Sequence, residues 1–235
     1  MKSTTHFISV ISLFVSLFLT SCSGDDSGQS DGTSTGDYFP MKVNNIWNFN
    51  ADGNIEQLKV VGTNEFGGTT YYELQDEGDD FGLNIQNWIT KKGATYYQKI
   101  ADVNTVQNGV TVNIKGYQMP MFKDDLAVNE TWSGTLRPKV TFNYNGNSGS
   151  LPTTVTYTGK IIARDATEVI NGVTYTNVIK MTMNAVTNVD GEINNVFSEY
   201  WFAKDIGPSL CNRKNINVKN IIYKKIDNHD VCFIF

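Results

Sequence analysis

The sequence predicts a mainly β fold, an antiparallel meander that curves into a half-barrel or folds as a sandwich, with little helix. Apolar and polar residues alternate with a period of two along much of the chain, in short runs rich in Val, Thr and Tyr. Asn-Gly and Asp-Gly dipeptides, which suit the positive φ angles of two-residue hairpin turns, separate these runs. Convincing helical spacing is missing, although the apolar positions in 119–128 allow a short helical turn.

The chain opens with the features of a signal peptide, residues 1–21. Lys2 supplies a positive charge, and the apolar run 7–19 is too short to span a bilayer as a helix. The run ends in Leu-Thr-Ser followed by Cys22, which resembles a lipobox. This resemblance implies that Cys22 carries a lipid anchor and that the protein is a lipoprotein of the cell envelope, in the outer membrane.

A segment without apolar residues follows. Residues 23–37 contain only Ser, Gly, Asp, Thr and Gln, so the sequence predicts that 22–37 is a flexible tether. The acidic pair Asp25 and Asp26 resembles an export signal that sends some lipoproteins to the cell surface, although a merely soluble linker is the alternative. The domain therefore faces either the periplasm or the exterior. Residues 38–235 are expected to form a single β-rich domain, because no second low-complexity segment divides them.

The charge balance argues against nucleic acid as a partner. The chain has 19 basic and 24 acidic side chains and a net charge of −5, and the signal peptide removes one of the basic ones, Lys2. An acidic protein is repelled by the phosphate backbone and by anionic lipid surfaces. The membrane is therefore expected to be reached through the lipid on Cys22.

Two cysteines remain after lipidation, Cys211 and Cys232. An even pair in an oxidising compartment predicts a disulfide, with two buried free thiols as the alternative. Metal ligation by this pair is disfavoured, because His229 is the sole histidine of the mature chain.

The clearest strand pattern lies at 173–184, where mostly apolar residues on one face alternate with mostly polar residues, three of them threonines, on the other. Hairpin dipeptides flank this run. The sequence predicts a meander of four antiparallel strands, at 154–164, 173–184, 185–189 and 192–203. Further strands are predicted near 43–50, 55–62, 68–75, 83–90, 94–101, 109–117, 130–136, 138–144, 216–226 and 231–235.

Two segments resemble parts of uncharacterised bacterial lipoprotein domains. Residues 38–47 begin with Tyr-Phe-Pro and end at Trp47, and residues 200–208 contain an aromatic-Ala-Lys sequence. Such domains are similar in outline to the LolA/LolB-like half-barrel, a curved antiparallel sheet whose concave side can hold acyl chains. The resemblance implies the fold but not lipid-carrier activity. Trp47 and Trp201 are expected in the core.

Aromatic residues supply the candidate ligand-binding side chains. Adjacent pairs must point to opposite faces of a strand, so one member of each pair faces away from the core. Exposed Tyr and Trp stack on sugar rings and also anchor protein interfaces, whereas aromatics on both sides of a partly covered sheet are the structural alternative. The candidates are Tyr71, Tyr72, Trp88, Tyr96 and Tyr97.

An acidic cluster offers a candidate metal site. Asp76, Glu77, Asp79 and Asp80 could present several hard oxygens to Ca²⁺, although their spacing is not that of an EF-hand. A solvated hairpin tip is the alternative. No other cofactor is expected.

Motifs for catalysis are missing from the sequence, including the Gly-x-Ser-x-Gly elbow, the phosphate-binding loop and His-Glu-x-x-His. We therefore expect a membrane-tethered, non-catalytic binding or scaffold domain whose ligand is a lipid, a glycan or a protein. A glycan-directed hydrolase whose carboxylates are assembled by the fold is one alternative. A structural subunit of a surface complex is another.

Overall fold

The structure, a computed structural model, describes residues 31–51, 54–76, 85–107 and 109–215. They belong to one compact unit, Asp31–Phe235. Every regular element among the described residues is a β-strand, and every ladder is antiparallel, which confirms the mainly-β prediction. The helical turn considered at 119–128 is wrong, because a strand and a loop occupy those residues.

A six-stranded sheet forms one wall of this unit. The strands lie in the order β1-β2-β3-β4-β5-β8. Their bounds are β1 (Ile46–Ala51), β2 (Asn54–Phe66), β3 (Thr69–Asp76), β4 (Asn87–Lys92), β5 (Thr95–Ile100) and β8 (Gln118–Lys123).

A five-stranded sheet forms the opposite wall, in the order β15-β14-β13-β12-β9. The strands are β9 (Thr131–Leu136), β12 (Thr153–Ile170), β13 (Val173–Val189), β14 (Glu192–Ala203) and β15 (Gly207–Asn215).

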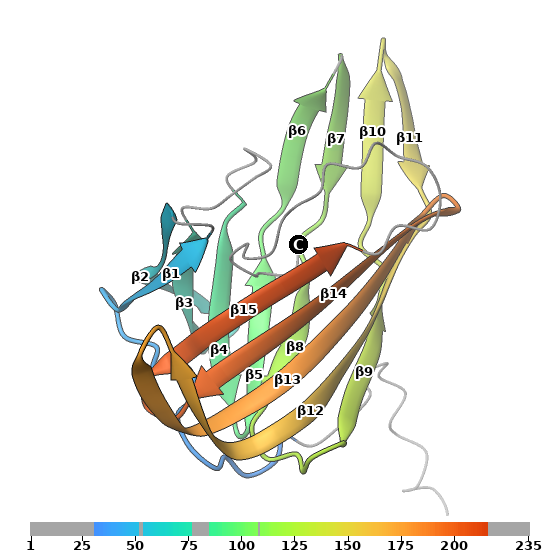
Figure 1. The fold of residues 1–235 in the computed structure, drawn as a ribbon. Coiled ribbons are helices and arrows are strands. Elements are labelled where there is room, and N and C mark those ends of the chain that lie inside the picture. Colours follow the sequence, from blue (N-terminus) through green and yellow to red (C-terminus); the bar gives the residue numbers. More distant parts are fainter. Residues whose placement is uncertain (1–30, 52–53, 77–84, 108, 216–235) are drawn as a thin grey trace, which may run out of the picture. The chain divides into compact units, whose positions relative to one another are not determined.

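A smaller sheet joins the two walls. It consists of β6 (Val103–Gln107), β7 (Val110–Ile114), β10 (Val140–Tyr144) and β11 (Asn147–Leu151), in the order β11-β10-β7-β6. Along the chain β6 continues β5, β7 leads into β8, β10 continues β9 and β11 leads into β12, while β7 pairs with β10. The three sheets are therefore one continuous meander, curled into a half-barrel from which the four-stranded sheet projects (Figure 1).

The first and last strands approach each other at one end. The indole Nε1 of Trp47 in β1 donates to the carbonyl oxygen of Ile206, just before β15, at 2.7 Å. Gly207 is required there, because its φ is +108° and a Cβ would collide with the Trp47 ring. No backbone ladder joins the described residues of β1 and β15, so the barrel stays open along this seam.

Aromatic and methionine side chains from both walls fill the interior. Phe122 of the six-stranded sheet stacks on Phe202 of the five-stranded sheet, with ring centroids 4.6 Å apart. Trp132 Nε1 donates to the carbonyl of Pro120 at 3.2 Å, which ties β9 to β8 where no ladder links them. The core members with the largest fully buried side chains are Trp132, Tyr38, Tyr96, Phe39, Phe122 and Phe202.

The long β12–β13 hairpin bends where its register shifts. Asp165 and Asn177 adopt positive φ angles of 51° and 53°, close to the shifts between Ala163 and Glu168. Bulges of this kind add twist and let a long strand pair coil. The prediction of separate strands at 173–184 and 185–189 is wrong, since β13 runs unbroken through both.

Trp201 is not a core residue, contrary to prediction. Tyr200 and Phe202 are 4% and 1% exposed, so the alternation of β14 sends Trp201 outward. There Lys180 Nζ lies 3.7 Å from its ring centroid, and its Nε1 donates to Glu199 at 2.7 Å. Trp47, in contrast, is buried as expected.

Candidate functional site

Residues 31–37, assigned to the flexible tether from composition, are packed against the half-barrel. We call this segment the strap. The amide of Ala94 donates to the Asp31 carbonyl at 2.6 Å, and the amide of Asp205 donates to the Asp37 carbonyl at 2.6 Å. The described domain therefore begins at Asp31, and the tether prediction fails for 31–37 because backbone and hydroxyl hydrogen bonds hold a segment that has no apolar surface.

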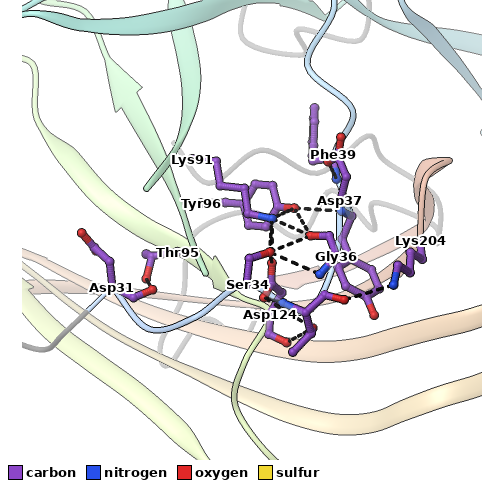
Figure 2. Close-up of polar contacts among 12 residues, drawn as sticks. Asp31, Ser34, Gly36, Asp37, Phe39, Lys91, Thr95, Tyr96, Asp124 and Lys204 are labelled. Carbon is purple, nitrogen blue, oxygen red and sulfur yellow. Dashed lines mark hydrogen bonds and ion pairs between the residues drawn. The ribbon is translucent and has the colours of Figure 1, made fainter. Parts of the chain in front are cut away.

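The strap is fastened by a buried carboxylate, Asp124, which follows β8 (Figure 2). Its side chain is fully buried, and its Oδ2 lies 2.8 Å from Lys91 Nζ. The Ser34 hydroxyl donates to Oδ2 at 2.9 Å, and the Thr35 amide donates to Oδ1 at 2.8 Å. Both carboxylate oxygens are thus satisfied by charge-assisted contacts.

The side chains of Tyr96 and Arg164 complete the cluster. Lys91 Nζ also donates to the Tyr96 hydroxyl at 2.8 Å and to the Gly36 carbonyl at 2.5 Å. Arg164 of β12 donates from Nη1 to the backbone carbonyls of Asp124 and Leu126, at 2.6 and 2.8 Å, and from Nη2 to the Thr35 hydroxyl of the strap at 3.0 Å. The strap is therefore held by β4, by the segment after β8 and by β12 at once.

The electrostatics of this cluster are those of a paired, buried charge that holds the strap. A carboxylate taken out of water is tolerated only when paired and hydrogen-bonded, and Asp124 is both. Burial raises the pKa of Tyr96, whose hydroxyl stays protonated while it accepts from Lys91 and from the Tyr38 amide. The Asp124 carboxylate, the Lys91 side chain and the Tyr96 hydroxyl are thus bonded to one another and to the chain segment of the strap.

The cluster and the projecting sheet mark opposite ends of the half-barrel. Ala94 and Asp124, which contact the strap, precede β5 and follow β8. The projecting sheet is reached through the other ends of these two strands, at Ile100 and Gln118. Figure 1 shows the same separation.

Two of the predicted ligand-binding aromatics, Tyr71 and Trp88, lie together on the outer face of the six-stranded sheet. Phe66 packs edge-on against both, with centroid distances of 5.4 and 5.2 Å. The Tyr71 hydroxyl donates to Gln118, and Trp88 Nε1 donates to Asn64 at 2.9 Å. At 4% and 7% exposure, Tyr71 and Trp88 leave little ring surface for a sugar.

The other three candidates do not join that cluster. Tyr97 shares the outer face, where its hydroxyl donates to the Asp31 carboxylate of the strap at 2.5 Å. Tyr96 is fully buried in the core, and Tyr72 packs against the core from the same inner face. The members of each pair do point to opposite faces, but the five side chains do not form one surface.

The remaining predicted sites fall largely outside the described residues. Of the acidic cluster, Glu77, Asp79 and Asp80 lie there, and only the backbone of Asp76 is described, at the end of β3. Cys22 and Cys232 lie there too. The backbone at Cys211 is in β15, opposite Tyr200. In the described part of the chain, no group of three or more His, Cys, Asp or Glu side chains is placed to hold a metal ion.

An open hollow of about 450 Å³ lies where β12 begins, on the outer face. Thr154 and Asn188 form a cross-strand pair next to the inward-facing Val155, so they point outward. Arg137 and Asp190 add one cation and one anion to the lining. Its volume falls in the range of small-ligand sites.

Sequence reasoning missed both the strap cluster and the hollow. Ser34 and Asp124 are 90 residues apart, and no local spacing marks them as partners. Arg137 and Asp190 likewise come together only through the pairing of β9, β12 and β13.

No protein-family model, curated protein or solved structure matches this chain. Among the described residues, none belongs to a helix long and apolar enough to cross a membrane. The site is therefore interpreted from its own geometry.

Proposed function

We propose that this chain is a lipid-anchored, non-catalytic lipoprotein of the cell envelope, whose β domain binds a ligand at the end away from the membrane. The observation that carries the proposal is the strap. The chain that leaves the lipobox cysteine is fixed to one end of the half-barrel, and the hollow and the projecting sheet lie toward the other.

The strap shortens the free tether. Only residues 23–30 lie between Cys22 and Asp31, the first residue of the strap. Fully extended, that stretch spans about 30 Å, and as a Gly/Ser-rich coil it spans roughly 17 Å. A lipid on Cys22 would keep the strap end close to the bilayer and turn the opposite end toward the surroundings.

The strap is also built to resist a pull on the tether. After Asp37 the chain enters the core with Tyr38 and Phe39, which are 2% and 1% exposed. A force on the anchor would act first on the Asp124 contacts and then on these two buried rings. This arrangement favours a load-bearing attachment over an enzyme's active site.

The binding role is supported by the hollow at Arg137 and Asp190 and by the absence of charge from the projecting sheet. Hydroxyl, amide and charged groups converge on the hollow, as in sites that orient a polar ligand. Lipid, glycan and protein were the ligand classes expected from the sequence, and the Arg137, Asp190 and Asn188 side chains in the lining favour a glycan or a peptide over an acyl chain.

Metabolic labelling with an alkyne fatty acid, followed by mass spectrometry of the N-terminal peptide, tests the anchor. The expected result is an acylated Cys22 at the mature N-terminus, with Cys22→Ser giving an unlabelled protein released from membranes. An unmodified Cys22 in membrane-derived wild-type protein would contradict the proposal. Protease treatment of intact cells then distinguishes the two locations. A surface-exposed domain is cleaved, whereas a periplasmic domain is protected.

A further inference from the structure

The four-stranded projecting sheet has no charged side chain. Its strands β6, β7, β10 and β11 have five residues each, and none contains Asp, Glu, Lys or Arg. Charged residues make up 18% of the whole chain, so their absence here is local. One face carries Val112 and Phe142, which continue the apolar lining of the half-barrel, and the other carries Asn, Ser and Thr together with the exposed Val106.

Among the described residues β11 is an edge strand of this sheet, and it contains neither Lys nor Pro nor a bulge. Lys, Pro and bulges normally block pairing with another chain. β11 reads Asn-Ser-Gly-Ser-Leu and pairs with β10 without a register shift. The edge strand β15 offers the contrast, because it contains Pro208, Arg213 and Lys214 and a register shift.

The hairpin turn defines which backbone groups of β11 point outward. Asn145 and Gly146 have φ angles of 49° and 81°, as a two-residue type I′ turn requires. Tyr144 and Asn147 are then the first hydrogen-bonded pair, and bonded and non-bonded pairs alternate along the ladder. Ser148 and Ser150 therefore turn their N–H and C=O groups away from β10.

The hollow lies at the foot of this edge. Pro152 of its lining follows directly on Leu151, the last residue of β11, and accepts a hydrogen bond from the Asp190 amide at 2.8 Å. β11 runs from the hairpin tip toward the hollow. A strand added antiparallel to it, as every ladder in this sheet is, would begin at the hollow beside the Asp190 carboxylate.

We propose that the β11 edge is a strand-addition site for an extended segment of another polypeptide. The segment is uncharged except at its start, where a lysine or a free amino terminus is placed in the hollow. This rests on the proposed binding function and names its ligand class. Main-chain hydrogen bonds to Ser148 and Ser150 supply the affinity, and Asp190 selects the basic first residue.

The probe is a short peptide of alternating valine and threonine that begins with lysine and carries a fluorophore at its C-terminus. Its anisotropy is titrated with the full-length chain in detergent. Ser150→Pro removes an outward N–H but no bond to β10, a position at which an edge strand tolerates proline. Ser150→Ala is the matched control, which keeps the N–H and loses only the hydroxyl.

Wild type and Ser150→Ala are expected to bind saturably, and Ser150→Pro to bind about tenfold more weakly or worse, with unchanged circular dichroism. Asp190→Asn should weaken binding of the lysine-led peptide and leave an N-acetylated, alanine-led peptide, which has no cation at its start, unaffected. Equal binding by wild type and Ser150→Pro, or no saturable binding, would overturn the proposal. A third result would also overturn the proposal: the wild type self-associates, Ser150→Pro does not, and neither binds the peptide. A second copy of the chain would then be the occupant of the edge. None of these results bears on the acylation of Cys22, so the two proposals fail separately.

Discussion

Lys91 Nζ and Asp124 Oδ2 lie 2.8 Å apart at the end of the six-stranded sheet, and the strap crosses the half-barrel directly on this ion pair. The Asp124 side chain is fully buried and that of Lys91 is 19% exposed. The pair therefore lies where water screens it little, and the strap supplies the hydrogen bonds that make its burial tolerable.

Removal of this charge should be far more costly than removal of an exposed one. Asp124→Asn leaves Lys91 without its counter-ion and should lower the free energy of unfolding by about 3–5 kcal/mol. The control is Asp102→Asn, in an ion pair with Lys115, where the Asp102 and Lys115 side chains are 45% and 55% exposed, and it should lower the free energy of unfolding far less. Urea denaturation measures both, and equal losses would contradict the fastening role.

A glycine at the junction of two core strands offers a second test. A methyl group at Gly159 would collide with Cε2 and Cζ2 of Trp132, so Gly159→Ala should destabilise the protein by about 1–3 kcal/mol. At Gly62 the nearest atom to such a methyl is Glu73 Oε2 at 3.8 Å, and Gly62→Ala should be neutral or slightly stabilising. Thermal melting of the two variants side by side checks the packing, which would be refuted if their order were reversed.

Two tryptophans should differ sharply in their contribution to stability. Trp132→Ala empties a fully buried position and should cost about 3–5 kcal/mol, whereas Trp201→Ala removes an outward ring and its contact with Lys180, about 1 kcal/mol. Chemical denaturation of the two variants is the measurement. A larger loss of unfolding free energy in Trp201→Ala than in Trp132→Ala would show that Trp201 is a core residue, as the sequence predicted.

Alkaline pH should destabilise the fold. Burial raises the pKa of five tyrosines, Tyr38, Tyr71, Tyr96, Tyr117 and Tyr157. Below pH 10 these phenols are protonated in both states. As the pH rises above the ordinary value of 10.0, the unfolded chain loses protons that the native chain retains, so the free energy of unfolding falls.

The near-ultraviolet absorbance of phenolate, followed together with circular dichroism, tests this dependence. The five phenols should ionise only above the ordinary value of 10.0, and Tyr96→Phe should flatten the decline in the free energy of unfolding. Full ionisation near pH 10 with the spectrum intact would show that the phenols are not buried.

Local pattern predicted much of the fold, and contacts distant in sequence account for the rest. Asn171-Gly172 and Asp190-Gly191 adopt the positive φ angles expected of hairpin tips, because the turn chemistry is contained in two residues. The period of two also determined which face of β14 is buried, and its strict use would have placed Trp201 outside. The sequence analysis did not predict the short strands β6, β8 and β11. Interruptions near Gly116, between β7 and β8, and at Pro152, between β11 and β12, divide longer stretches of extended chain into short strands.

The candidate sites were harder to predict. Ser, Thr, Gly and Asp have the composition of a disordered tether, and nothing local distinguishes the strap from the residues before it. Thr35 is ordered because Asp124 and Arg164, far along the chain, supply its partners. The hollow is likewise formed by three strands whose pairing brings Arg137 near Asp190.

Limited proteolysis of the membrane-derived protein, with mass spectrometry of the released fragments, tests the central claim most directly. If the strap fastens the domain, cleavage occurs within 23–30, and the smallest stable fragment begins at or before Asp31. In Asp124→Asn the cleavage should extend into the strap. A stable wild-type fragment that begins after Asp37 would contradict the account.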